Sequence, residues 1–391
     1  MILTGVRDRR AHPCATGSSR HGIRPARGES TPVADTNRHR DDQKELAVLV
    51  DGHIGGSIDG TSGADIAGIS AQITEAEQIG YDGVWTTEVG RDPFLPLLLA
   101  ADRSPRLQVG TAIAVAFARN PMTMASTAND LQAFSSGRFV LGLGSQIKPH
   151  IQRRFSMPWS APADRMREFV LAMRAIWRNW HHGEPLDFRG DIYQHTLMTP
   201  TFNPGPNPYG PPPVLIAAVG AKMTSVAAEV ADGMLVHAFT TERYLQEVTL
   251  PNVESVLHEN GKKREQFTLS YTGLVATGLD EKSYDEAVRT VRNRIAFYGA
   301  TPAYRGVLEL HGWGDLHTEL HRLSKQNDWD VMTELVDDTV LHTFAVVGEP
   351  AAVAKDIRRR FDGLIDRFTL YVPYTMADEA RRTIVAGLQE N

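Results

Sequence analysis

The chain has a single cysteine, Cys14, which excludes an internal disulfide bond and any metal cluster held by several thiolates. No segment approaches the ~20 consecutive apolar residues that a membrane-spanning helix needs. The sequence also lacks HExxH, CxxC, Walker and serine-elbow motifs, so it gives no sign of zinc-protease, phosphate-loop or serine-hydrolase chemistry. These absences predict a cytoplasmic protein that binds neither a membrane nor a metal.

Positive charge is concentrated at the N-terminus. Residues 1–44 hold nine Arg or Lys and five Asp or Glu, a net charge of +4, so residues 45–391 carry −10 of the total of −6. An acidic body offers no surface for nucleic acid. The first 44 residues are rich in Gly, Ser, Pro and Arg and have no apolar core of a secretory signal, which predicts a disordered extension. A targeting or docking role for this extension is the alternative, and residues 45–391 are expected to form one domain.

Near-continuous apolar runs alternate with segments of helical periodicity from residue 45 onward. Such runs are typical of parallel strands that are buried on both faces. Helices are expected between them and after the last one, and eight strand–helix units predict a (β/α)₈ (TIM) barrel. The predicted strands are residues 45–51, 82–88, 106–116, 138–146, 214–219, 233–239, 267–277 and 367–372.

Two longer segments interrupt this alternation, one after strand four and one after strand seven. Residues 183–213 contain a hairpin-like stretch and a loop with seven prolines between 200 and 213. Residues 299–335 are predicted to form a lid or a subdomain. Aromatic and basic residues on such a segment would close over a substrate, or they would form the small core of a helical subdomain, which is the default for Trp313. The residues assigned to substrate contact or the lid are Trp85, Tyr304, Arg305, His311 and Trp313.

Glu88 is the strongest candidate for chemistry. It ends the apolar strand 82–88, where burial favours the neutral carboxyl group and suits it to proton transfer at neutral pH. The alternative is a structural Glu88 that pairs with Arg91 or Arg119 and holds the rim of the barrel together. Asp51 is expected at the corresponding end of strand one, where it would bind substrate or cofactor, or would cap the loop that follows.

Glycines mark two further strand ends. The segment Gly142–Gln146 would let a flat ring approach strand four and meet polar groups beyond it, although packing against a neighbouring helix explains a GxG nearly as well. The segment Val219–Thr224 contains a glycine at a strand-to-helix junction, which leaves backbone N–H groups available for a phosphate, and Lys222 adds charge. A simple tight turn is the alternative here. His181 and His182 have no carboxylate at metal spacing and are interpreted as a helix C-terminus.

These motifs resemble the bacterial-luciferase-like superfamily, and within it the oxidoreductases that use the deazaflavin coenzyme F420. The resemblance runs from about Glu45 to the C-terminus, and it rests on the segments Trp85–Glu88, Asp92–Pro96, Asn120–Pro121 and Gly142–Gln146. In the sugar-phosphate dehydrogenase branch of that family, the position of Glu88 carries a histidine. The departure leaves the substrate undefined.

The resemblance implies that a strand bulge with a non-proline cis peptide lies behind the deazaflavin ring at Thr111 and Ala112. It also implies hydride transfer between F420 and a small organic substrate. The alternatives are an FMN-dependent luciferase-like monooxygenase and a non-catalytic flavin-binding protein. A homo-oligomer such as a dimer is left open as the assembly. The residues predicted to bind the cofactor are Asp51, Thr111, Ala112, Gly144, Ser145, Gln146, Val219, Gly220, Ala221 and Lys222.

Overall fold

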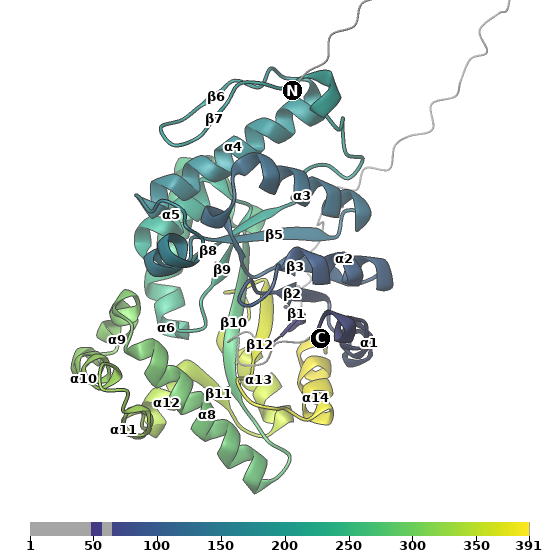
Figure 1. Cartoon of the computed structure of the whole chain (residues 1–391). Coiled ribbons are helices and arrows are strands. Elements are labelled where there is room, and N and C mark those ends of the chain that lie inside the picture. Colours follow the sequence, from purple (N-terminus) through teal and green to yellow (C-terminus); the bar gives the residue numbers. More distant parts are fainter. Residues whose placement is uncertain (1–47, 57–64, 391) are drawn as a thin grey trace, which may run out of the picture. The chain divides into compact units, whose positions relative to one another are not determined.

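Eight parallel strands close into a barrel in the computed structural model, which describes residues 48–56 and 65–390 (Figure 1). The predicted extension over residues 1–44 lies outside the described residues. The last strand pairs with the first and closes the ring, so the predicted (β/α)₈ fold is confirmed. In order around the barrel the strands are β1 (Leu49–His53), β2 (Gly83–Thr86), β3 (Gln108–Thr111), β5 (Phe139–Gly144), β8 (Val214–Ala218), β9 (Gly233–Val236), β10 (Thr268–Ala276) and β12 (Arg367–Tyr371).

Helices surround this ring, and their ends carry ordinary start and stop signals. The side chain of Asn120 accepts the N–H of Thr123 at 3.0 Å, and Pro121 follows it at the first helical position. Gly80 and Gly183 end two helices with φ of 96° and 69°. The helices are α1 (Ile69–Ile79), α2 (Phe94–Arg103), α3 (Pro121–Phe134), α4 (Pro162–His182), α5 (Ala221–Val230), α6 (Glu242–Tyr244), α7 (Leu250–Glu259), α8 (Glu281–Gly299), α13 (Pro350–Phe361) and α14 (Asp378–Gln389).

Most residues of the barrel strands are buried on both faces, which explains the largely apolar runs in the sequence. Alternate residues such as Val84 and Leu141 point outward and join the core beneath the helices. Their neighbours point inward, and Trp85, Val140 and Leu235 belong to a second apolar cluster inside the barrel. Within one strand, a side chain at the strand end therefore points inward if it is an even number of residues from an inward-facing residue of that strand.

The third strand is broken by a bulge. It ends at Thr111, a cis peptide joins Ala112 to Ile113, and pairing with β5 resumes at β4 (Ala114–Val115). A Cβ atom on Gly142 would lie 1.8 Å from the carbonyl oxygen of Thr111, and one on Gly144 would lie 2.7 Å from the side chain of Ile113. The predicted bulge is present, and these two glycines make room for it rather than for a neighbouring helix.

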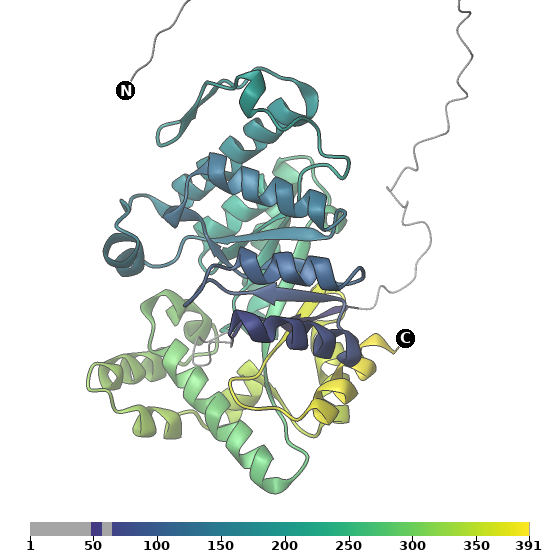
Figure 2. The ribbon, with the colours of Figure 1, turned by 45° about the vertical axis from the view of Figure 1, so that its right-hand side comes forward.

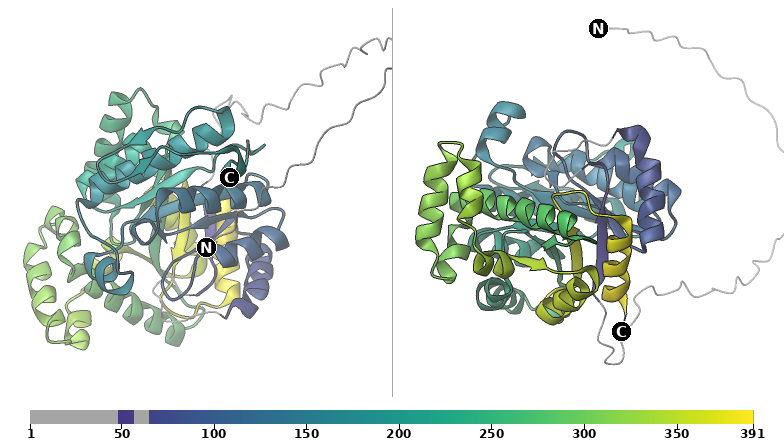
Figure 3. Two further views of the ribbon diagram at one scale, coloured as in Figure 1. Left: turned by 45° about the horizontal axis from the view of Figure 1, so that its top comes forward. Right: turned by 90° about the horizontal axis from the view of Figure 1, so that it is seen from below.

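The two insertions lie at opposite ends of the described barrel domain (Figures 1 and 2). The first contains the antiparallel hairpin of β6 (Phe188–Arg189) and β7 (Gln194–His195), beside α4. The second ends later than predicted, at Phe344 rather than near residue 335, because a fourth helix continues it into the edge strand β11 (Ala345–Val347). Its helices gather beside α8 (Figure 3). They are α9 (Arg305–Leu310), α10 (Gly314–Ser324), α11 (Trp329–Glu334) and α12 (Asp338–Phe344).

The second insertion shares an apolar core with the barrel. Phe344 stacks on Phe239, which follows β9, with ring centroids 4.3 Å apart. Tyr371 at the end of β12 belongs to the same buried cluster. Of the two forms predicted for this segment, the structure has the helical subdomain. Within residues 48–56 and 65–390, no helix is long and apolar enough to cross a membrane.

Candidate active site

The carboxyl ends of the barrel strands, which we call the mouth, bring polar side chains together from far apart in the chain. His53 ends β1, and its ring contacts Thr87, which follows β2. Nε2 of His53 lies 2.8 Å from Oγ1 of Thr87, and Nδ1 lies 2.9 Å from the carbonyl oxygen of Gly56. Oγ1 of Thr87 also lies 2.8 Å from the carbonyl oxygen of Ala112 in the bulge. Burial lowers the pKa of His53 to about 4, so the ring is neutral near pH 7.

Asp51 lies within β1 instead of at its end, so the position predicted for it is wrong. The strand continues to His53, and the fully buried carboxylate of Asp51 accepts a hydrogen bond from Nε of Arg367 at 2.7 Å. Burial on its own would lower the pKa of Arg367, but the charge and hydrogen bond of Asp51, together with the charges of Asp82 and Asp366, raise that pKa above its ordinary value. Asp51 therefore forms an ion pair inside the barrel, and it caps no loop.

Trp85 belongs to the same interior and not to a lid. It is 2% exposed, and its ring lies against Gly110, where a Cβ atom would come within 2.4 Å. The guanidinium of Arg367 lies 5.6 Å from its ring centroid. Its Nε1 is buried and has no hydrogen-bond partner among the described residues, so this N–H marks an unsatisfied donor inside the barrel.

Glu88 sits on the rim beside the bulge. Its backbone N–H donates to the carbonyl oxygen of Ile113 at 3.1 Å. Its carboxylate oxygen Oε2 accepts from the N–H of Val115 at 2.7 Å and from Nη1 of Arg119 at 2.6 Å. Arg119 also pairs with Asp92. The ion pair of the structural alternative is thus present, with Arg119 as the partner of Glu88, and the proton-transfer role of Glu88 stays a prediction.

The end of β5 carries the polar residues predicted there. Ser145 and Gln146 directly follow the strand and are half-buried, and Oγ of Ser145 donates to the carbonyl oxygen of Gln146 at 3.1 Å. Gln146 has a φ of 57°, which turns the chain sharply away from the strand. Both residues come directly after Gly144, which pairs with Val115 at the far side of the bulge.

The junction between β8 and α5 is open. Gly220 is the N-cap of α5, it is exposed, and nothing lies within 4 Å of the position that its Cβ would occupy. Since glycine has no side chain to cap the helix, the first N–H groups of α5, including those of Ala221 and Lys222, point out of the helix end. Val219 before them is half-buried and Lys222 is exposed. This arrangement suits an anionic group.

A second histidine at the mouth was not among the predicted site residues, and its strand, β9, lies three strands from β1 around the barrel. His237 follows β9, and its Nε2 lies 3.0 Å from Oη of Tyr304, a predicted lid residue. The two rings stack with centroids 4.5 Å apart, and Tyr298 meets His237 edge-on at 4.8 Å. Burial lowers the pKa of His237 to about 4. The sequence signal that could have identified His237 as a mouth residue is its position two residues after the inward-facing Leu235.

The other lid residues do not reach the mouth. Arg305 is exposed and pairs with Glu309 at 2.6 Å on the surface of α9. His311 stacks on Trp313 at 4.8 Å, and its Nε2 lies 2.9 Å from Oγ1 of Thr241. Trp313 packs into the subdomain core, which is the default role that the sequence predicted for it.

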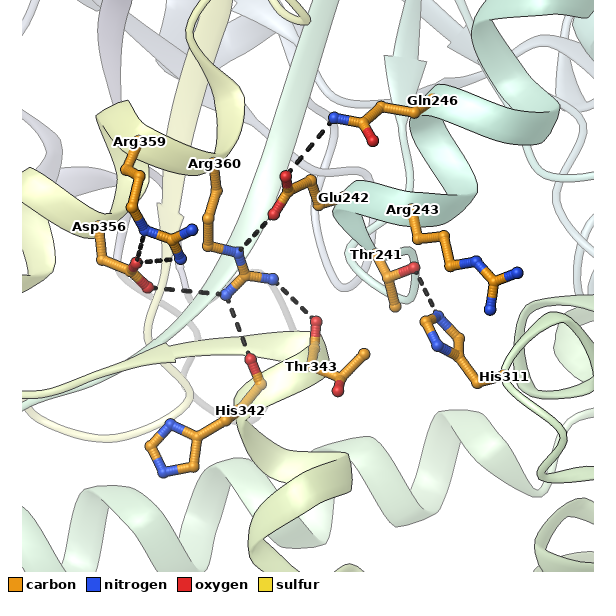
Figure 4. A pocket seen from close by; sticks show the side chains of 10 residues that line it. All are labelled: Thr241, Glu242, Arg243, Gln246, His311, His342, Thr343, Asp356, Arg359 and Arg360. Atoms are coloured by element: carbon orange, nitrogen blue, oxygen red, sulfur yellow. Dashed lines mark hydrogen bonds and ion pairs between the residues drawn. The ribbon is translucent and has the colours of Figure 1, made fainter.

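His311 instead lines a separate cleft of about 570 Å³ whose lining residues lie on helices, their caps or helix-joining turns (Figure 4). Its charges are compensated within the chain. Arg359 pairs with Asp356, and Arg360 donates to the carbonyl oxygens of His342 and Thr343. This cleft is held together by the insertion and α13, and we assign no ligand to it. No metal-binding group of three His, Cys, Asp or Glu is found among the described residues.

A closed parallel barrel with polar side chains and an open helix start at its mouth defines a barrel enzyme. The comparisons narrow the class: the chain belongs to the luciferase-like monooxygenase family, whose model matches residues 45–367. The family places the chain among the oxidoreductases.

Relatives cover most of the chain. An uncharacterised protein of Mycobacterium tuberculosis is 51% identical over 333 residues, which are 85% of this chain and 97% of the relative. The 5,10-methylenetetrahydromethanopterin reductase of Archaeoglobus fulgidus is 28% identical over 292 residues, 72% of this chain and 82% of the relative. The structure of the coenzyme F420-dependent tetrahydromethanopterin reductase from Methanopyrus kandleri matches with a TM-score of 0.69 at 19% identity, over 88% of this chain and 97% of that one. This structural likeness shows the fold alone.

Proposed function

We propose that this protein transfers a hydride between coenzyme F420 and a small organic substrate at the mouth of the barrel. The proposal rests on two features that lie at the carboxyl ends of barrel strands. One is the bulge at Ala112, and the other is the open N-terminus of α5 at Gly220. Together they suit a flat ring with an anionic tail. The choice of F420 is supported by relatives of 25–28% identity that are named as methanopterin reductase, F420-dependent oxidoreductase and F420-dependent dehydrogenase.

The residues at the mouth fit such a group. Small or half-buried residues at Ala112, Gly144 and Val219 leave a wall without bulky charged side chains. Ser145 and Gln146 supply polar atoms at the end of β5. The exposed helix start at Gly220, Ala221 and Lys222 supplies donors for a phosphate. FMN has the same ring-and-phosphate form, so these residues alone do not distinguish the two cofactors.

When bound, the deazaflavin would supply or accept the hydride at its C5 atom, and the protein would supply position and a water-poor site. Thr87 would hold the backbone of the bulge by donating its hydroxyl hydrogen to the carbonyl oxygen of Ala112. Glu88 is proposed to give or take the proton that accompanies hydride transfer, from a carboxylate held by Arg119.

Titration of the purified protein with F420 and then with FMN, followed by absorbance, tests the cofactor. We expect micromolar or tighter affinity for F420 and at least ~tenfold weaker binding of FMN, a difference of ~1.4 kcal/mol. Tight co-purification of FMN without F420 binding, with oxygen consumed on reduction, would establish the FMN-dependent monooxygenase instead. Binding without turnover by any electron donor would support the non-catalytic alternative.

The phosphate site has its own test. Lys222→Ala should weaken F420 binding by ~1–3 kcal/mol, the range for a hydrogen bond to a charged group. Lys355→Ala, which removes an exposed lysine from α13, is the matched control and should leave affinity unchanged. Equal affinities for both variants and the parent protein would place the phosphate elsewhere.

A further inference from the structure

The hydrogen bonds around His237 fix which of its ring nitrogens carries the proton. The backbone N–H of Phe239 donates to Nδ1 of His237 at 3.0 Å. A backbone N–H can only donate, so Nδ1 must present a lone pair. Because burial keeps the pKa of this ring far below neutrality, the ring is uncharged near pH 7 and its one hydrogen lies on Nε2.

This proton assignment sets the direction of the next hydrogen bond. Nε2–H of His237 donates to Oη of Tyr304 at 3.0 Å, so the phenol oxygen is an acceptor in that contact. The hydroxyl hydrogen of Tyr304 is therefore not used by His237. Within the described ranges, Oη of Tyr304 has no second hydrogen-bond partner. Burial also raises the pKa of Tyr304, so the hydroxyl group keeps its hydrogen and acts as a donor at neutral pH.

The position of Tyr304 places this donor at the mouth. His237 lies two residues after Leu235, whose side chain is inside the barrel, so the histidine turns toward the same axis. Tyr304 is stacked on this ring, and Tyr298 lies edge-on to both rings. Oη of Tyr298 is 3.1 Å from Oη of Tyr371 at the end of β12. The phenol of Tyr304 is thus held by three aromatic neighbours, His237 and Phe239 after β9 and Tyr298 of α8.

We infer that Tyr304, oriented by His237, donates a hydrogen bond to an oxygen atom of the substrate, and that the substrate is a carbonyl compound or the corresponding alcohol. The inference rests on the hydride transfer proposed above. A carbonyl oxygen gains negative charge as its carbon is reduced, so a donor fixed in advance binds it more strongly as the reaction proceeds. Hydride reduction of an imine proceeds through the protonated iminium ion, whose nitrogen has no lone pair for such a donor. The polarity of this chain of hydrogen bonds therefore favours carbonyl and alcohol substrates over imines.

The first test needs neither cofactor nor substrate. In the full-length protein labelled with ¹⁵N-histidine, the signals of His237, assigned by their loss in His237→Asn, should show a protonated Nε2 and an unprotonated Nδ1 from pH 7.5 to 6. The opposite tautomer, or a cationic ring at pH 7, overturns the inference.

The second test uses reduced F420 with acetone and cyclohexanone as ketone probes and 1-pyrroline as an imine probe. Tyr304→Phe should bind F420 as tightly as the parent protein and lose ~10²–10³-fold in kcat for the ketones, the usual effect of removing one such donor. The matched control is Tyr374→Phe, which removes a hydroxyl that accepts the N–H of Thr277 at 2.9 Å. It should lower the melting temperature while ketone turnover persists.

The outcomes separate this inference from the proposed function. Failure of the parent protein to bind F420 would count against the proposed function, and the ¹⁵N experiment would still decide the direction of the hydrogen bonds. Binding of F420 with turnover of 1-pyrroline but of neither ketone overturns the inference alone. So does F420 binding with no turnover of any probe. Unchanged ketone turnover in Tyr304→Phe, with only a lower melting temperature, would make Tyr304 a packing residue.

Discussion

Replacing Asp51 by asparagine should destabilise the barrel without affecting cofactor binding. The carboxylate of Asp51 is fully buried and engages Arg367, whose side chain is only 7% exposed. Asparagine has nearly the same shape but no charge, so the guanidinium would remain in the barrel without its counter-ion. Breaking a buried ion pair by removing one partner costs ~3–5 kcal/mol, because an uncompensated charge is left behind.

Two further variants make this expectation specific. Asp51→Leu combined with Arg367→Met removes both charges, and apolar replacement of a buried pair is often neutral or stabilising by ~1–4 kcal/mol. Asp102→Asn removes one partner of an exposed pair with Arg103, whose side chains are about 60% exposed, and should change stability by less than ~1 kcal/mol. The order of stability is therefore expected to be double variant, then control, then Asp51→Asn.

Urea unfolding followed by circular dichroism measures these differences, and F420 titration of each folded variant measures affinity. The reasoning is refuted if Asp51→Asn unfolds at the same urea concentration as the parent protein. Weaker F420 binding at unchanged stability would instead restore the contact that the sequence predicted for Asp51.

Three other predictions concern the mouth and the barrel strands. Glu88→Gln should keep F420 affinity and lower kcat by ~10²–10⁴-fold. Full turnover per folded molecule with a lower melting temperature would show that Glu88 serves only in the ion pair with Arg119. Gly142→Ala should cost at least ~1–3 kcal/mol of stability because the new Cβ meets backbone of the bulge. Gly220→Ala, with open space around it, should cost less, at most ~1 kcal/mol from the poorer N-cap. The free energy of unfolding should fall as the pH drops from about 6.5 to 4, because His53 and His237 bind protons readily only in the unfolded chain. Urea unfolding at pH 7 and pH 5 measures this difference, and equal free energies at the two pH values would contradict the lowered pKa values.

The barrel was predictable because its strands have a sequence signal that depends on few neighbours. All eight predicted strands are present, because a strand buried on both faces is mostly apolar and therefore visible as a run in the sequence. The ends of the strands were less certain. Moving the end of β1 by two residues turned Asp51 from a predicted mouth residue into a buried ion-pair partner and concealed His53. The partner of Asp51 is Arg367, which lies 316 residues away in the sequence.

The predicted lid residues show a second limit of prediction from the sequence. Aromatic and basic side chains on an inserted segment have the same composition whether they face a substrate or one another. Only the packing of α9 to α12 separates Tyr304, which reaches a strand end, from Trp313, which fills the subdomain core. His237 was missed for another reason: a single histidine after an apolar run indicates only that the strand has ended. Its role emerges only from its contacts with Phe239 and Tyr304.

The aromatic core shared by the barrel and the second insertion bears on how this protein could diverge or be engineered. Phe239 and Tyr371 lie at strand ends, yet Phe344 and Tyr298 of the inserted region and α8 complete their packing. Excising residues 299–344, or grafting them onto another barrel, would strip large apolar side chains of their neighbours on both sides of the cut. This segment is thus not a portable module. Changes in substrate specificity on this side of the barrel are expected to arise by single substitutions among the aromatic residues of this shared core.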